Sequence, residues 1–361
     1  MAGASTVTEP LLAQDVSHHE IASLCVMSRA DRTAQSGTEA TLNHHQANRC
    51  FMMRDRRALT LRSCAGANSR LGLMRPLRRR RVPKRTTVNQ EATLSFEDIL
   101  YEVRDGRATI TINRPEKLNA FRSQTVLELA EAFEMAADDE SVGVIVFTGA
   151  GERAFCVGGD VASPTRTAAE KRQLHHRHDR LAMAIRNNGK PIIMRVLGYC
   201  IGGGNELNIL CDLTIAGESA KFGQAGPKIG SAPLWWGCQL MPFVVGEKKA
   251  REILFLTRQY TAQEALAMGL CNTVVPDAEI DATVDEWCTD ILRRSPIGLR
   301  LAKLALNAAT DQVYSAVQHG LELVAINHVF GDEPKEGIAS FQEKRKPDWR
   351  KFRDGQGPEP A

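Results

Sequence analysis

From residue 95 onward, apolar runs with the character of strands alternate with helical patterns. Continuous apolar runs at 142–147, 191–196 and 213–216 suit strands that are covered on both faces. Helical patterns lie between or after them, at 173–186 and 205–211. Such an alternation is typical of an α/β domain in which right-handed crossovers connect parallel strands.

The chain is expected to have three parts. Residues 1–90 show no sustained hydrophobic period and should form a disordered, basic N-terminal extension. Residues 91–250 should form the α/β core, and residues 251–361, which are helical in pattern almost throughout, a helical C-terminal part.

The basic character of the chain is confined to its N-terminal extension. Residues 1–90 hold 15 Lys/Arg and 6 Asp/Glu, whereas the whole chain holds 46 Lys/Arg and 43 Asp/Glu. The rest of the chain therefore has more acidic than basic residues. We interpret the extension as a solvated tail or the product of a misassigned start codon. An organelle transit peptide after Met52 and a nucleic-acid-binding arm are the alternatives.

Composition indicates a cytoplasmic protein. The sequence contains no run of eighteen apolar residues, which is the length needed to span a membrane, and its N-terminus lacks the pattern of a secretory signal. The nine cysteines are widely spaced without a C-x-x-C pair, which argues against a disulfide framework and against a zinc site. We therefore expect reduced thiols, no metal and no membrane association.

Two glycine-rich segments, at 155–160 and 198–206, each follow a strand-like run. Glycine lets the backbone aim N–H groups into a cavity and lets a carbonyl approach closely. The two segments are therefore interpreted as halves of an oxyanion hole, which would stabilise the negative charge of an enolate oxygen. Glu206, three residues after Gly203, would act as a nearby acid or base, or would be a solvated carboxylate at a helix start.

Seven motifs extend this interpretation along the chain. They lie at 113–121, 154–160, 198–204, 211–213, 222–224, 265–270 and 341–347, and read NRPEKLNAF, AFCVGGD, GYCIGGG, CDL, FGQ, ALAMGL and FQEKRKP. With these motifs in this order, the chain from about Ser95 to Phe352 resembles the crotonase, or enoyl-CoA hydratase/isomerase, superfamily. The resemblance implies a crotonase-type ββα spiral with a helical C-terminal part.

The same resemblance implies an acyl-CoA substrate. Its thioester carbonyl would lie between the backbone N–H groups of Gly159 and Gly203, and Glu206 would stand for one of the two carboxylates that hydratases use. The second carboxylate would fall at Gly226, so this chain lacks it. That departure weighs against simple hydration of a straight-chain enoyl-CoA.

Within the superfamily, segments 159–160, 223–231 and 246–253 are most similar to dihydroxynaphthoyl-CoA synthase and to hydrolases that open cyclic keto-acyl-CoA rings. The synthases typically have an apolar residue in place of Glu206, and their catalytic tyrosine would fall near Val329. Hydrolytic ring opening is therefore the preferred reaction. Enoyl-CoA hydration or isomerisation, a synthase-like lyase reaction and RNA binding through the basic arm are the alternatives.

Further residues receive roles from the resemblance. Asp160 would orient substrate or water, or cap the helix that follows, and Ser231 would be catalytic or a plain turn hydroxyl. Trp235 and Trp236 would wall an acyl pocket, or belong to the core or a subunit contact. Predicted contacts to CoA or substrate are Lys117, Ala120, Ala154, Gln224, Gly226, Phe341 and Lys344.

Other expectations concern assembly and cofactors. The resemblance implies a homotrimer or hexamer, in which residues 251–361 mediate trimerisation and Phe341 and Lys344 reach the nucleotide of a neighbouring subunit. No cofactor is expected beyond the coenzyme A of the substrate, and no nucleic-acid partner. The cluster of His175, His176 and His178 is interpreted as a solvated helix face, and Cys156 as a buried thiol.

Overall fold

The computed structural model describes residues 96–161 and 167–353. The predicted N-terminal extension lies outside these residues. The main sheet has six strands in the order β1-β2-β3-β5-β7-β10. These strands are β1 (Ile99–Arg104), β2 (Arg107–Ile112), β3 (Val144–Gly149), β5 (Ile192–Val196), β7 (Leu213–Gly217) and β10 (Thr273–Val275). Only β1 pairs antiparallel, with β2 as its neighbour, and every other pair in this sheet is parallel.

A second sheet has four strands in the order β4-β6-β8-β9. It contains β4 (Ala154–Cys156), β6 (Tyr199–Ile201), β8 (Lys221–Gly223) and β9 (Gln259–Thr261). Three times in succession the chain adds one strand to the main sheet and the next strand to the second sheet. This repeat is the predicted ββα spiral, and the apolar runs that were expected to be strands form β3, β5 and β7.

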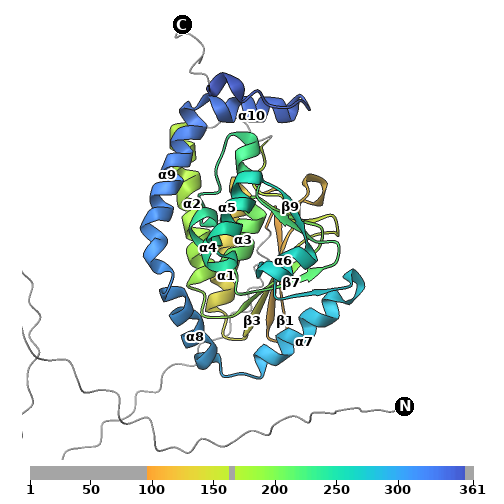
Figure 1. Cartoon of the computed structure of the whole chain (residues 1–361). Helices are drawn as coiled ribbons and strands as arrows, with labels where there is room; N and C mark the ends of the chain where they lie inside the picture. Colours follow the sequence, from red (N-terminus) through yellow and green to blue (C-terminus); the bar gives the residue numbers. More distant parts are fainter. Residues whose placement is uncertain (1–95, 162–166, 354–361) are drawn as a thin grey trace, which may run out of the picture. The chain divides into compact units, whose positions relative to one another are not determined.

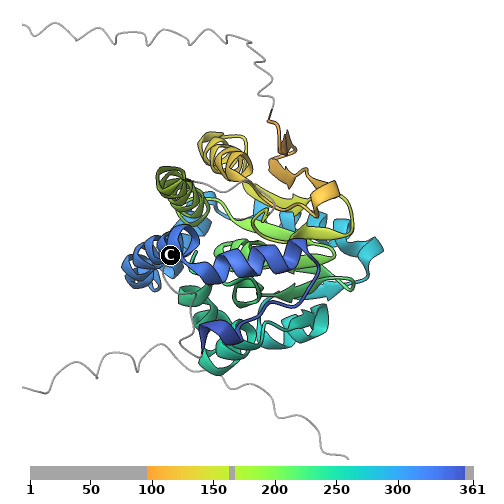
Figure 2. The same ribbon diagram turned by 90° about the horizontal axis from the view of Figure 1, so that it is seen from above.

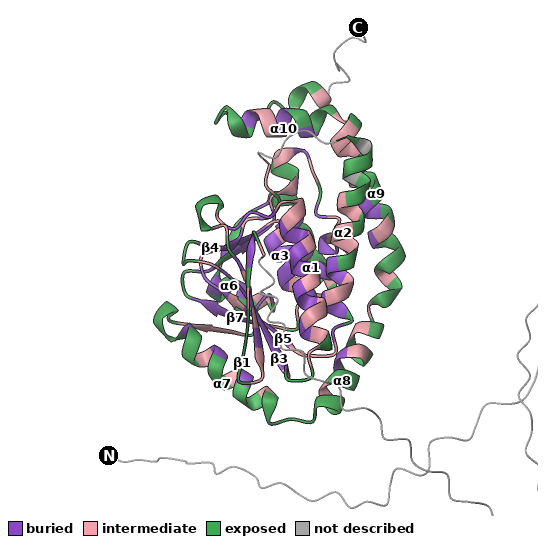
Figure 3. Cartoon of the chain, turned by 180° about the vertical axis from the view of Figure 1, so that it is seen from behind, coloured by how far each residue is buried: buried purple, intermediate pink, exposed green. Residues whose placement is uncertain are grey.

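Six helices lie in or beside the spiral. They are α1 (Ser123–Asp138), α2 (Ala168–Arg186), α3 (Gly203–Leu210), α4 (Gly237–Val245), α5 (Glu247–Leu256) and α6 (Ala262–Met268). Five short 3-10 helices join the elements: η1 (Pro115–Lys117), η2 (Gly226–Ile229), η3 (Asp277–Glu279), η4 (Asp311–Val313) and η5 (Arg350–Phe352). The largest buried cluster lies between the sheets and the helices, and buried residues concentrate there in Figure 3.

The C-terminal part is largely helical, as expected. It consists of α7 (Ile280–Leu292), α8 (Pro296–Ala308), α9 (Tyr314–Phe330) and α10 (Asp332–Gln342), together with β9, α6 and β10. In Figure 1, α9 runs along α2 on the outside of the domain, and α10 turns back over one end of it. Figure 2 shows the same layers of helices from above. None of the helices in the part of the chain that the structure describes is long and apolar enough to cross a membrane.

Candidate active site

The two glycine-rich segments lie against each other. β4 and β6, which precede them, are parallel neighbours in the second sheet. A Cβ atom on Gly158 would lie 2.8 Å from the Gly203 nitrogen, and one on Gly204 would lie 2.2 Å from the Cys156 carbonyl oxygen. Gly158 also has a φ of +93°, which a residue with a side chain rarely adopts. The close approach of the segments therefore requires glycine.

The N–H groups of Gly159 and Gly203 are available as donors. Phe121 forms a β-bridge with Gly159 through the carbonyl of Gly158 and the N–H of Asp160, so the Gly159 N–H is directed away from this pairing. Gly203 is the first residue of α3, where N–H groups lack a partner within the helix. Neither N–H donates to a carbonyl within residues 96–161 and 167–353. Two such donors can stabilise an oxyanion.

Glu206 lies one turn into α3 and is buried, with 7% of its surface exposed. The alternative of a solvated carboxylate at a helix start is therefore wrong. Its Oε1 atom accepts no hydrogen bond from the residues that the structure describes. Burial raises the pKa of Glu206 to about 8, although the backbone N–H groups of Gly237 and Trp235 act in the opposite direction. A carboxylate with this pKa can exchange a proton near neutral pH.

Two buried amides near this part of the chain also have unused polar atoms. Gln224 follows β8 and is 2% exposed, and neither its Nε2 nor its Oε1 atom has a partner among the described residues. Asn205, adjacent to Glu206, is fully buried and its Nδ2 atom is likewise unpaired within that set. Buried polar atoms without partners are unusual and are typical of a site that receives a ligand or water.

Gly226, where the second carboxylate of a hydratase was expected to fall, begins η2 and lies close to segment 231–233. A Cβ atom there would lie 3.1 Å from the Ser231 carbonyl oxygen and 3.2 Å from Ala232 Cα. Both contacts are tighter than ordinary packing, so a side chain at this position would require segment 231–233 to shift by a few tenths of an ångström.

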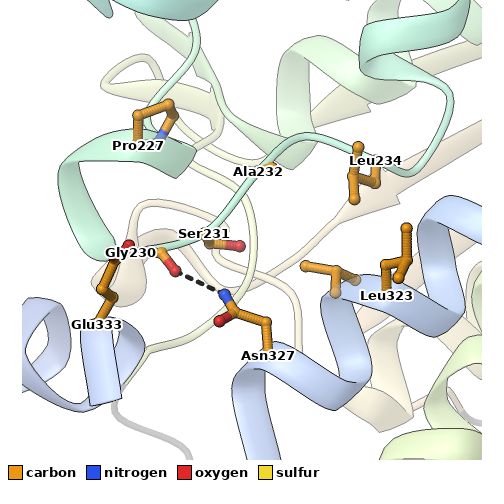
Figure 4. A pocket seen from close by; sticks show the side chains of 9 residues that line it. Pro227, Gly230, Ser231, Ala232, Leu234, Leu323, Asn327 and Glu333 are labelled. Atoms are coloured by element: carbon orange, nitrogen blue, oxygen red, sulfur yellow. Dashed lines mark hydrogen bonds between the residues drawn. The ribbon is translucent and has the colours of Figure 1, made fainter. Parts of the chain in front are cut away.

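Ser231 has a specific partner that the sequence did not predict. Its Oγ atom lies 2.8 Å from Nε2 of His328 in α9, within hydrogen-bond distance. Ser231 also lines a cavity of about 390 Å³ between η2, α9 and α10, shown in Figure 4. This cavity is lined by neither Gly159, Gly203 nor Glu206.

The adjacent tryptophans have different surroundings. Trp235 is 4% exposed, its indole donates to the His178 carbonyl at 3.0 Å, and its ring meets the ring of Phe121 edge to face at 6.0 Å. The ring of Phe121 in turn lies close to Gly203, since a Cβ atom added to Gly203 would be 2.5 Å from it. Trp236 is fully buried, and the Arg186 guanidinium lies over its ring, 4.6 Å from the ring centroid. Trp235 therefore neighbours the glycine site, whereas Trp236 belongs to the core.

His178 corrects the interpretation of the histidine cluster. It is half-buried, and its ring packs edge to face against Trp235 at 4.6 Å and Phe121 at 5.8 Å. Only His176 of the three is exposed, so the cluster is not a solvated helix face. Within residues 96–161 and 167–353, no three His, Cys, Asp or Glu side chains are placed to hold a metal ion. Cys156 is fully buried, and burial raises the pKa of its thiol to about 12.

Asp160 is held by an ion pair with Arg114 at 3.2 Å, and both side chains are largely buried. It does not cap the following helix, because Thr167 is the N-cap of α2. The capping alternative for Asp160 is therefore wrong.

Asn119 was missed as a site residue, although it lies in one of the motifs. Its Nδ2 atom donates to the carbonyls of Ala154 at 2.7 Å and Ala150 at 3.0 Å, and its Oδ1 atom accepts from the Arg114 N–H. It has a φ of +56°, which Asn tolerates better than most residues. Asn119 thereby joins the loop after β2 to β4.

The predicted CoA contacts fall in two places. Lys117, which is exposed, and Ala120 and Ala154, which are buried, lie in or beside the loop that Asn119 holds. Phe341 and Lys344 lie at the end of α10 and are exposed. In the described part of the chain, no hydrogen bond or ion pair joins these two residues to the glycine segments or to Glu206.

Comparison with known proteins matches residues 102–352 to the family model for enoyl-CoA hydratase/isomerase. A solved enoyl-CoA hydratase from Mycobacterium avium subsp. paratuberculosis K-10 is 30% identical, with a TM-score of 0.65 over 71% of this chain and 99% of that one. An enoyl-CoA hydratase/isomerase from Xanthobacter autotrophicus Py2 is also 30% identical, with a TM-score of 0.64 over 73% of this chain and all of that one.

Proposed function

The chain belongs to the enoyl-CoA hydratase/isomerase family, and from this premise we propose that it opens the ring of a cyclic keto-acyl-CoA by hydrolysis. The observation that carries the proposal is the buried Glu206, whose Oε1 atom is unpaired among the described residues. Its pKa of about 8 suits a general base near neutral pH. Gly226 leaves this site without the second carboxylate of a hydratase.

The proposed reaction begins with water. Glu206 takes a proton from a water molecule as its oxygen bonds to the ring ketone carbon. The bond between that carbon and the α-carbon then breaks, and its electron pair forms the thioester enolate. The N–H groups of Gly159 and Gly203 stabilise the enolate oxygen, and loss of one such donor typically costs about 3–4 kcal/mol. Protonation of the α-carbon completes a dicarboxylic mono-CoA product.

Binding of the CoA portion is assigned to two regions. The exposed Lys117 suits a phosphate group of the nucleotide as a compact point charge, with Ala120 and Ala154 beside it. Gln224, with its unused amide atoms, would bind the acyl group or the attacking water. Phe341 and Lys344 would contact CoA of a neighbouring subunit in a homotrimer or hexamer, and no further cofactor takes part.

Turnover of 2-ketocyclohexanecarboxyl-CoA, crotonyl-CoA and succinylbenzoyl-CoA, followed by mass spectrometry, tests this proposal. We expect the cyclic ketone to gain the mass of one water, and Glu206→Gln to abolish that gain. A gain of water only with crotonyl-CoA would contradict ring opening.

The second candidate function is hydration or isomerisation of an enoyl-CoA with Glu206 as the single carboxylate. It is supported by the two solved relatives above, which are an enoyl-CoA hydratase and an enoyl-CoA hydratase/isomerase. Loss of the conjugated-enoyl absorbance of crotonyl-CoA distinguishes it, because ring opening of a saturated ketone consumes no enoyl group.

A further inference from the structure

We propose that Ser231 and His328 form the acid that protonates the α-carbon of the enolate, in place of the carboxylate that this chain lacks at Gly226. The inference rests on the proposed function, since it concerns the last step of that reaction. It adds His328, which no motif of the sequence indicates, to the acid–base groups of the site.

The pair is built by two elements that are distant in the chain. Ser231 follows η2, His328 lies in the last turn of α9, and their Oγ and Nε2 atoms are 2.8 Å apart. The adjacent Asn327 donates from Nδ2 to the Gly230 carbonyl at 3.0 Å, which holds α9 against this loop. Figure 4 shows this hydrogen bond and Ser231 on the wall of the cavity that faces α9.

Ser231 adjoins the position of the missing carboxylate. Its N–H donates to the Gly226 carbonyl at 2.9 Å, and its own carbonyl oxygen is the atom nearest to a Cβ on Gly226. The same short segment continues to Trp235 and Gly237, whose N–H groups lie near the Glu206 carboxylate. One segment therefore borders both Glu206 and the Ser231–His328 pair.

The proton balance of the step is simple. The Ser231 hydroxyl gives its proton to the α-carbon, and the electron pair of the enolate forms the new C–H bond. The Nε2–H of protonated His328 then restores the Ser231 hydroxyl. The proton that Glu206 took from water returns to His328 through solvent, so the reaction consumes one water and no net proton. Histidine suits this role because its imidazole ring can both donate and accept a proton.

Exchange of the α-proton of a thioester distinguishes the role of the Ser231–His328 pair from that of Glu206. The probe is butyryl-CoA in D₂O, whose deuterium uptake is measured by mass spectrometry, beside turnover of 2-ketocyclohexanecarboxyl-CoA. We expect Ser231→Ala and His328→Ala each to lower exchange by about 10²-fold or more. The double variant should exchange the α-proton no more slowly than either single variant, because the two residues act as a unit. Glu206→Gln should lose turnover but keep exchange.

Two controls exclude a merely structural effect. His319→Ala removes an exposed histidine from the same helix and should change neither rate. Added imidazole should restore part of the exchange in His328→Ala. Imidazole would restore no exchange if the variant had lost activity through a packing defect. Exchange that survives in His328→Ala, or that Glu206→Gln abolishes, would overturn the inference while leaving ring opening intact. Wild-type protein that shows neither exchange nor turnover would overturn the proposed function and this role together.

Discussion

Two glutamates with little exposed surface have opposite surroundings. Glu206 is 7% exposed and lies deep in the domain, whereas Glu336, in α10, is 8% exposed and lies near the surface beneath the half-exposed side chains of Arg345 and Lys351. Glu206 Oε1 is unpaired within the described part of the chain, whereas Glu336 accepts hydrogen bonds from Arg345 at 2.5 Å, the Asp348 N–H at 2.8 Å and Lys351 at 3.0 Å. Burial raises the pKa of Glu206 to about 8, and the partners of Glu336, Arg345 foremost, hold its pKa well below the usual range.

We interpret the difference between them as that between a reactive carboxylate and a structural one. A deeply buried carboxylate with few hydrogen-bond partners is destabilised in its charged form, and proteins retain such groups mainly at functional sites. A carboxylate with several donors is stable as an anion and cannot serve as a base near neutral pH. Glu336 instead ties the chain after α10 to that helix.

The largest effect is expected for Glu206→Gln. The amide keeps the size of the side chain but cannot accept a proton from water, so turnover of the cyclic ketone should fall by about 10²–10⁴-fold. Steady-state kinetics by mass spectrometry, with circular dichroism to verify folding, measure the effect. Less than a tenfold loss in a folded variant would mean that Glu206 is not the base.

Gly203→Ala should follow in size. Its Cβ atom would lie 2.5 Å from the Phe121 ring and 3.3 Å from Gly158 Cα, so the start of α3 must move and its N–H with it. Loss of one oxyanion donor typically lowers kcat by about 10²–10³-fold. Gly298→Ala is the matched control, because Gly298 is exposed in α8 and a Cβ atom there would meet only the Ser295 side chain, at 3.3 Å. If Gly203→Ala lowers kcat no more than Gly298→Ala, the oxyanion role of Gly203 is wrong.

The pH dependence of kcat/KM should report the raised pKa of Glu206. A base must be deprotonated to act, so kcat/KM should rise about tenfold per pH unit and level off above pH 8. The same measurement on Glu336→Gln should give the same profile, because Glu336 does not titrate in this range. A rate that is flat between pH 6 and 8 would contradict the assignment of Glu206.

The strands and the glycine site could be predicted from local sequence, whereas the Ser231–His328 pair and the partners of Glu336 could not. Apolar runs of strand length indicated β3, β5 and β7, and glycine spacing indicated that segments 155–160 and 198–206 meet. Ser231 and His328 are 97 residues apart, and no periodicity reports a contact at that distance. Arg345 and Lys351 likewise have the sequence pattern of ordinary surface residues. They contact Glu336 because the chain turns back after α10.

The smallest effect on turnover is expected for Glu336→Gln, which should change it less than twofold. Its effect on stability should instead be clear and pH-dependent. The pKa of Glu336 is lowered on folding, so its stabilisation is present above the ordinary pKa of 4.5 and is lost as pH falls. The variant should therefore have a lower Tm at pH 7 and a smaller difference from the wild type at pH 4.

Glu206→Gln should shift stability in the opposite direction. The pKa of Glu206 rises from 4.5 to about 8 on folding, so the folded state holds a proton that the unfolded chain releases, and wild-type stability declines across that interval. The glutamine variant lacks this decline and should be more stable than the wild type at pH 8, with little difference below pH 5. Thermal melting of both variants from pH 4 to 9 checks this contrast. Parallel Tm profiles would show that the two carboxylates do not differ as their partners indicate.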